Sequence, residues 1–189
     1  MAIVPTAESE FEVTATDGIY TYTKTLTGKV YEASNGYNVS WKMMPPMNTV
    51  PLTMEALTAD DIVVNDPKDG MQYSVNGGAK ISISSTENPK TITVEAGDKV
   101  QFYGNGQSIT SYERTMIAGG SSQVKVYGNI MSLVDEKNFA TATELTAEET
   151  FYGLFINNTT LTDASGLLLP ATTLAQGCYH LMFREHKGA

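Results

Sequence analysis

Apolar and polar positions alternate in short runs through the first part of the chain. These runs cover residues 11–14, 19–26, 29–32 and 37–41, and they are separated by Asp17-Gly18, Thr27-Gly28 and Asn35-Gly36. Short β-branched and aromatic runs divided by Asp-Gly and Asn-Gly predict antiparallel strands joined by tight turns. We therefore expect a mainly β chain that opens with an N-terminal β-meander within residues 1–50.

A proline pair ends this pattern. In the segment Met43-Met44-Pro45-Pro46-Met47, neither proline has an N–H to donate to a sheet, and Pro-Pro favours an extended conformation. Residues 43–51 are therefore expected to form a linker or a crossing segment.

A second β-rich region is expected over residues 51–128. Its candidate strands cover residues 53–57, 62–65, 71–75, 79–84, 91–94, 99–103, 108–112 and 123–127. The Asn76-Gly77-Gly78 link joins two alternating runs and is the strongest hairpin signal in the chain. Short strands at this spacing predict a β-sandwich-like module or a small barrel.

An imperfect repeat marks the third region, residues 129–189. Residues 147–155 and 175–183 align at an offset of 28, which places Phe151 over Tyr179 and Phe155 over Phe183. Thr146 and Glu149 have the spacing of a capping box, which predicts a short helix within 144–156 and a copy of it at 175–183. A fixed period of this length indicates a solenoid, whose units bury their apolar faces against neighbouring units.

The repeat stops early. A solenoid needs about three units to be stable alone, whereas this one ends after the aromatic half of its second unit. Tyr179, Met182 and Phe183 then have no following unit, so they are interface candidates, and we expect self-association at this end.

Composition narrows the possible partners. The formal charge is −9, with 12 Lys and Arg residues scattered along the chain, which argues against binding a nucleic-acid backbone. No apolar run is long enough to cross a bilayer, and the first residues lack the basic and apolar regions of a signal peptide. We expect a chain that folds in a cytoplasm, without membrane insertion.

Candidate catalytic chemistry is sparse. Cys178 and His180 are two residues apart and have no evident third group to orient them. The adjacent pairs Asp60-Asp61 and Glu148-Glu149 do not make an acid/base dyad, and the segment from Asp66 to Gly70 is typical of a turn. No enzyme activity, cofactor or metal is expected.

Aromatic residues and methionines near the N-terminus are candidate interface residues. The set is Tyr20, Tyr22, Tyr31, Tyr37, Trp41, Met43, Met44 and Met47. Tyr and Trp are favoured at protein interfaces and Met makes adaptable apolar contacts. The alternatives are that the aromatic residues fill a small core and that the methionines form a covered linker.

Several strings resemble one known family. Gly70-Met-Gln-Tyr73-Ser-Val-Asn76-Gly77-Gly78 and Val94-Glu-Ala-Gly97-Asp98-Lys99-Val-Gln-Phe102-Tyr-Gly104-Asn are similar to the β-module that precedes the repeats in BspA-like leucine-rich-repeat surface proteins of gut Bacteroidetes. Tyr127-Gly128-Asn129-Ile-Met-Ser-Leu133 and Leu169-Pro170-Ala-Thr-Thr-Leu174-Ala175 resemble the entry to that repeat and its first unit. The resemblance covers about residues 52–183, and it implies a surface adhesion module, ending in a truncated leucine-rich-repeat-like β/α segment, that acts by binding.

Two departures from the family suggest that a different class of protein carries this module. Family members continue through many repeats and are exported, whereas this sequence does neither. We therefore expect a virion protein of a phage of these bacteria, assembled in the host cytoplasm. Residues 1–50 would dock on capsid or tail proteins and form a homo-oligomer, while the rest binds a host-cell surface protein or glycan. The alternatives are an adhesin fragment on the bacterial surface and a glycan-active enzyme.

Overall fold

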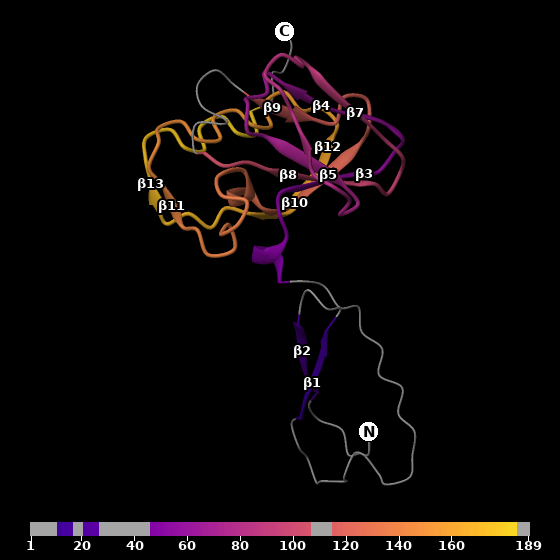
Figure 1. Cartoon of the computed structure of the whole chain (residues 1–189), viewed down its shortest axis with the longest axis vertical. Coiled ribbons are helices and arrows are strands. Elements are labelled where there is room, and N and C mark those ends of the chain that lie inside the picture. Colours follow the sequence, from indigo (N-terminus) through magenta and orange to yellow (C-terminus); the bar gives the residue numbers. More distant parts are fainter. Residues whose placement is uncertain (1–10, 17–20, 27–45, 107–114, 185–189) are drawn as a thin grey trace. The chain divides into compact units, whose positions relative to one another are not determined.

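The computed structural model of the protein describes residues 11–16, 21–26, 46–106 and 115–184. The chain divides into two compact units, Met1–Pro46 and Met47–Ala189 (Figure 1).

The described part of the first unit is a two-stranded antiparallel hairpin. Strand β1 covers Phe11–Thr16 and strand β2 covers Thr21–Leu26, with Phe11 opposite Leu26 and Thr16 opposite Thr21. The predicted strands at 11–14 and 19–26 are therefore confirmed for the described residues. The predicted strands at 29–32 and 37–41 lie outside the described residues.

The register of this hairpin separates two kinds of position. Residues opposite each other in an antiparallel ladder share a face, and neighbours along a strand alternate between faces. One set of positions is polar, and its members Thr14 and Thr25 are exposed. The other set pairs Phe11 with Leu26, Val13 with Lys24 and Ala15 with Tyr22. An isolated two-stranded hairpin is marginally stable in water.

The described residues of the second unit, 47–106 and 115–184, form three sheets and two short 3-10 helices. The strands are β3 (Thr53–Ala56), β4 (Asp60–Asn65), β5 (Gln72–Val75), β6 (Ile81–Ser82), β7 (Lys90–Val94), β8 (Lys99–Tyr103), β9 (Met116–Ala118), β10 (Val124–Asn129), β11 (Glu144–Leu145), β12 (Leu161–Leu168) and β13 (Thr173–Leu174), and the helices are η1 (Met47–Thr49) and η2 (Ile130–Leu133). The largest sheet has the order β12-β10-β3-β8-β5-β6, β4 is central between β7 and β9, and β11 pairs with β13. The described chain is therefore mainly β.

Most strands predicted for residues 51–128 occur close to their expected positions. The Asn76-Gly77 turn is also confirmed: both residues have positive φ, and the Gly78 N–H donates to the Val75 carbonyl at 2.9 Å. Strand β9 is not predicted by the sequence because its three residues carry too short a pattern, and the predicted strand at 108–112 lies outside the described residues.

One apolar core runs through the second unit. Along β8 and β10 buried positions alternate with more exposed ones, as expected for strands with one face on the core. The core includes Phe102 and Ile117 in the sheet region and also Phe151, Phe155 and Met182 in the repeat region. Because β10 and β12 both belong to the largest sheet, that sheet continues into the repeat region without interruption.

The repeat region is a coil of two rungs. The first rung, residues 124–158, runs through β10, η2, β11 and a series of turns, and the second rung, residues 161–184, runs through β12, β13 and an equivalent series of turns. Strand β12 lies parallel to β10, and β13 lies parallel to β11. In Figure 1, β11 and β13 lie at one side of this unit, away from β4 and β7.

The short helix predicted within 144–156, and its copy at 175–183, are wrong. Residues 148–157 and 176–183 form turns, because Glu149, Phe151 and Gly153 in the first rung and Gly177 and Leu181 in the second rung have positive φ. A right-handed helix requires negative φ at every residue. The apolar residues therefore align between rungs and not along one face of a helix.

Candidate binding edge on the two-rung coil

Aromatic rings stack between the two rungs at the predicted offset. The ring centroids of Phe155 and Phe183 are 5.4 Å apart, and those of Phe151 and Tyr179 are 5.9 Å apart, both pairs nearly parallel. Tyr152 meets the ring of His180 edge-on at 5.4 Å. The 28-residue offset therefore relates the turns of the two rungs, with the second member of each pair on the second rung, whereas β10 and β12 pair at a longer offset, such as Val124 with Leu161.

Backbone hydrogen bonds between the rungs have one direction along the turns. The N–H groups of Glu149, Gly153, Phe155 and Asn157 donate to carbonyl oxygens of the second rung, at 2.8 to 3.0 Å. Within each rung the intervening N–H groups donate three residues back, such as Tyr152 to Glu149 and His180 to Gly177. Along these turns the first rung therefore supplies the N–H donors and the second rung supplies the carbonyl acceptors, whereas around β11 and β13 the N–H groups of Thr172, Thr173 and Ala175 donate to the first rung.

The same geometry leaves donors on the far side of the second rung. The second-rung residues equivalent to Glu149, Gly153 and Phe155 lie 28 positions later in the sequence and are Gly177, Leu181 and Phe183. No N–H of these three residues donates to another described residue. We call the side of the second rung that carries these groups the open edge. It comprises the N–H groups of Gly177, Leu181 and Phe183 together with the side chains of Leu169, Leu174 and Phe183.

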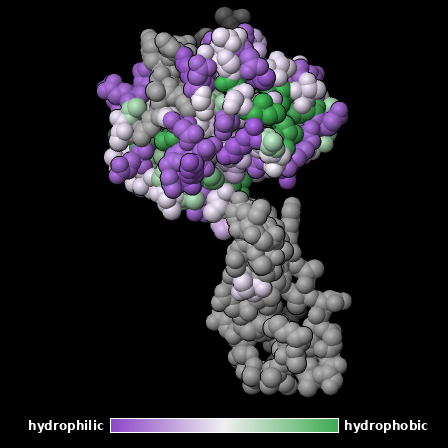
Figure 2. Space-filling model, in the orientation of Figure 1, coloured by the Kyte–Doolittle hydropathy of each residue, from purple (hydrophilic) through white to green (hydrophobic). Residues whose placement is uncertain are grey.

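The side chains of the open edge are unusually exposed for apolar residues. Leu174 is 53% exposed, Phe183 45% and Leu169 43%. Over the face of this unit seen in Figure 2, polar residues predominate and apolar residues form scattered patches. The second rung also carries little charge, since Asp163 and Arg184 are the only Asp, Glu, Lys or Arg residues among 161–184, in a chain of net charge −9.

The opposite end of the coil is closed by the rest of the unit. On that side β10 pairs with β3, and the Ile117 N–H donates to the Leu154 carbonyl at 2.8 Å. Strands β3 and β9 therefore occupy the place that a preceding rung would take. Among the described residues of this unit, one end of the coil is covered and the other end is not.

Strand β12 is protected along its first half. The Asp163 carboxylate accepts a hydrogen bond from the Ser165 N–H at 2.8 Å, and this bond lowers the pKa of Asp163. The pairing of β12 with β10 is irregular over the same stretch. A bulge and a charged side chain on an edge strand discourage pairing with another strand. The accessible part of the edge therefore begins after Ser165.

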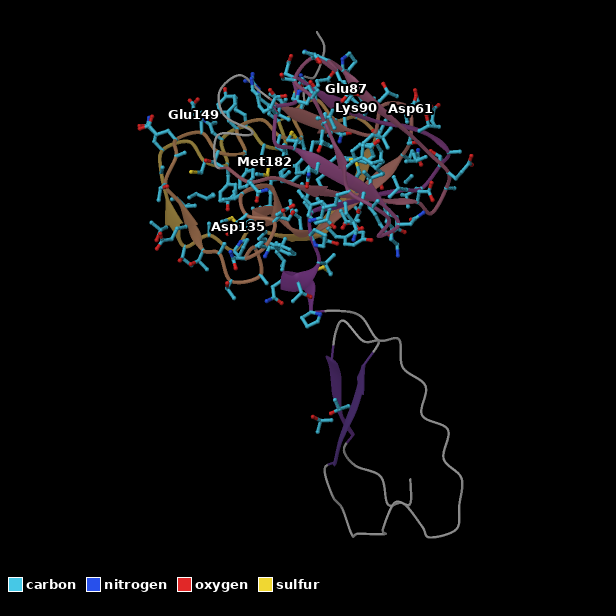
Figure 3. The ribbon with its side chains drawn as sticks, viewed as in Figure 1. Asp61, Glu87, Lys90, Asp135, Glu149 and Met182 are labelled. Atoms are coloured by element: carbon cyan, nitrogen blue, oxygen red, sulfur yellow. The ribbon has the colours of Figure 1, made fainter. Side chains whose placement is uncertain are left out.

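The interface candidates predicted from the sequence fall into three groups. Tyr179, Met182 and Phe183 lie together on the second rung, where Met182 is buried, Tyr179 is half-buried and only Phe183 is exposed. In Figure 3, Glu149 lies at the outer rim of the coil and Met182 lies further in. Met47 is half-buried at the start of η1, and Tyr22 lies in β2 opposite Ala15. The remaining candidates lie outside the described residues: Tyr20, Tyr31, Tyr37, Trp41, Met43 and Met44.

The half-buried Tyr179 has an unusual hydroxyl group. It is enclosed beside the backbone of Ala171 and makes no well-aligned hydrogen bond with the described residues. Burial raises the pKa of Tyr179 to about 12, and the neighbouring Cys178 adds to the rise. This residue stabilises the stack of the two rungs more than it contributes to the exposed edge.

The candidate catalytic residues do not converge. Cys178 is buried and its Sγ lies 3.5 Å from the Ala147 carbonyl, whereas His180 is exposed beside Tyr152. In the turn region from Asp66 to Gly70, the carboxylates of Asp66 and Asp69 bond to Asn88 and to the Ser85 N–H. These bonds join two neighbouring turns.

The described residues contain neither a metal-binding cluster nor a membrane-spanning helix. In the ranges given above, no three His, Cys, Asp or Glu side chains gather closely enough to hold a metal ion. No helix in the same part of the chain has the length and hydropathy to cross a bilayer.

The sequence pattern identifies Phe183 of the open edge but misses its two leucines and the backbone donors of Gly177 and Leu181. Leu169 and Leu174 are absent from the predicted interface residues, although both belong to the Leu-spaced segment between the repeat units. The donor groups of Gly177 and Leu181 belong to the backbone, so only the 28-residue offset combined with the hydrogen bonds of the first rung reveals them.

Comparison of the chain with models of protein families, with curated proteins and with solved structures finds no match.

Proposed function

We propose that this protein is a non-enzymatic structural and adhesion protein of a phage virion, a decoration or fibre protein attached to the capsid or tail. In this proposal residues 1–50 dock on the particle and join copies into a homo-oligomer. The unit that begins at Met47 is displayed as a surface-binding module, with a sandwich-like part over 51–128 and a truncated leucine-rich-repeat-like part over 129–189. Its partners are the particle and a surface protein or glycan of the host cell.

The observation that carries the proposal is the open edge. It combines exposed Leu169, Leu174 and Phe183 with three backbone donors on a rung that is nearly free of charge. Large apolar side chains left exposed on one rung are typical of an interaction surface. A surface of this kind supports binding and offers no group for acid/base or nucleophilic catalysis.

The N-terminal hairpin supports a docking role. Strands β1 and β2 carry an apolar set of positions such as Phe11, Val13 and Leu26, which a packed partner would cover. Assembly of several copies would supply such a partner. Display of many copies would also convert weak surface contacts into useful avidity.

Mass spectrometry and immunogold labelling of purified phage particles test this proposal. We expect the full-length chain to copurify with infectious particles through a density gradient, and an antibody against residues 47–184 to label intact particles. If the chain is missing from the particles and is found in the envelope fraction of uninfected bacteria, the alternative holds, a cell-surface adhesin fragment of the BspA-like type. The resemblance of residues 52–183 to those surface proteins supports that second candidate.

A further inference from the structure

We infer that the open edge binds a segment of another polypeptide that takes up the turns of the second rung and adds to the coil as a third rung. This inference rests on the proposed binding function of the unit, but not on where the protein is displayed. The first rung already holds the second through the same chemistry.

The interface between the two rungs defines what an occupant must supply. In the first rung the N–H groups of Glu149, Gly153 and Phe155 act as donors. Their acceptors are the carbonyl groups of Gln176, His180 and Met182 in the second rung. The open edge repeats those donors at Gly177, Leu181 and Phe183. An occupant therefore needs backbone carbonyl groups at matching intervals, which a polypeptide segment with the same turns as residues 176–183 provides.

The exposed side chains of the open edge determine which side chains the bound segment must carry. Phe183 stacks on Phe155 with one face and is 45% exposed, so a further apolar or aromatic side chain has room to pack on it. Leu174, which pairs with Leu145 in the parallel ladder, is 53% exposed. The near absence of charge in the second rung favours an equally neutral segment.

A second copy of the folded protein fits less well. Two copies meeting end to end at this edge would place the donors of Gly177, Leu181 and Phe183 against the same donors of the other copy. The covered end of the coil is not available either, because β10 is already paired with β3. The hydrogen-bonding direction along the turns thus favours a segment that offers carbonyl groups there over end-to-end pairing of copies.

A peptide of residues 161–184 is a suitable probe, because this segment is the one that covers a rung in the folded protein. Binding of the fluorescent peptide to the full chain is measured by anisotropy, with a scrambled peptide as a control. We expect saturable binding of the native peptide and at least tenfold weaker binding of the scrambled one.

Variants of the full chain test the edge itself. Leu174→Glu and Leu169→Glu should each weaken peptide binding at least tenfold. Ile81→Glu is the matched control, since Ile81 is 46% exposed on β6 at the opposite edge of the same sheet, and binding should change less than twofold.

Hydrogen exchange of the unmodified chain gives a second measurement that does not depend on any variant. The amides of Gly177, Leu181 and Phe183 should exchange at least tenfold more slowly with the peptide bound, while those of Glu149, Gly153 and Phe155 stay protected throughout. The inference would be overturned if the peptide did not bind, or if Ile81→Glu weakened peptide binding as much as Leu174→Glu does. It would also be overturned by faster exchange at Gly177 and Leu181, because the peptide would then have displaced the second rung. A concentration-dependent dimer that Leu174→Glu abolishes would also overturn it, in favour of a second copy. Absence of the chain from virions would leave all of these outcomes unchanged.

Discussion

Phe155 and Phe183, separated by 28 positions in the chain, lie with their ring centroids 5.4 Å apart and their planes 20° from parallel. Phe155 is buried, whereas Phe183 is 45% exposed. The two rings pack the second rung against the first, so their interaction energy is part of the free energy that holds the second rung in place.

A double-mutant cycle tests this relationship. Phe155→Leu and Phe183→Leu should each destabilise the protein, and an aromatic pair adds about 0.5–1.5 kcal/mol beyond simple burial. We therefore expect a coupling energy in this range from the free energies of unfolding of the four proteins in urea. Phe155→Leu combined with Ile81→Leu, far from the coil, should show coupling below about 0.3–0.5 kcal/mol. Equal coupling in the two cycles would contradict the stacking contribution.

Gly128 is required by a close contact as well as by its backbone conformation. Its φ is +89°, and an added Cβ would lie 2.1 Å from the Pro51 carbonyl oxygen. Gly70 has a similar φ of +98° with no atom near the same position. Gly70→Ala should cost about 1–2 kcal/mol from the left-handed conformation alone. Gly128→Ala should cost roughly twice as much or more, because the backbone at Pro51 must also move. Similar midpoints of urea unfolding for the two variants would contradict the contact.

Asn129 ties the start of the second unit to the coil. Its buried side chain donates to the carbonyl groups of Asn48 at 3.1 Å and Phe139 at 2.8 Å, and accepts from the Met131 N–H at 3.0 Å. Each buried polar group left without a partner costs about 1–3 kcal/mol. Asn129→Ala should therefore lower the free energy of unfolding, measured in urea, by about 2–4 kcal/mol.

Asn105→Ala is the control for Asn129→Ala. Asn105 is exposed and accepts one long hydrogen bond, 3.4 Å from the Glu136 N–H. Its replacement should change stability by no more than about 0.5 kcal/mol. A loss at position 129 as small as that at position 105 would show that the three bonds of Asn129 have little net effect.

Tyr179 should make stability fall at alkaline pH. Its pKa is raised to about 12 in the folded protein, whereas an unperturbed Tyr titrates near 10. Between these values the unfolded chain loses the proton first, so the contribution is intact below about pH 10 and declines as the pH rises through the folded pKa. Urea unfolding of the wild type and of Tyr179→Phe at pH 8, 10 and 11.5 measures this. The wild type should lose more stability than the variant over that interval, and parallel losses would exclude the effect.

The turns and strand positions of this protein follow largely from local sequence. Asn76-Gly77 forms its predicted turn because two adjacent positions of positive φ suit Asn and Gly. Strands such as β8 follow from alternating apolar residues. The 28-residue offset of the repeat likewise predicts that Phe151 lies over Tyr179 and Phe155 over Phe183, and both ring pairs are stacked.

Only the tertiary structure decided how the repeat is built and where it is open. Local pattern favoured a helix near Thr146, yet Glu149 and Phe151 take positive φ so that their rung can bond with the next one. The free energy of the contacts between the rungs comes from hydrogen-bond partners such as Glu149 and Gln176 and from ring pairs such as Phe155 and Phe183, which are far apart in the sequence and lie outside any local pattern. For the same reason, the pairing of β10 with β3, which covers one end of the coil and leaves the donors of Gly177, Leu181 and Phe183 at the other, is a property of the assembled sheet.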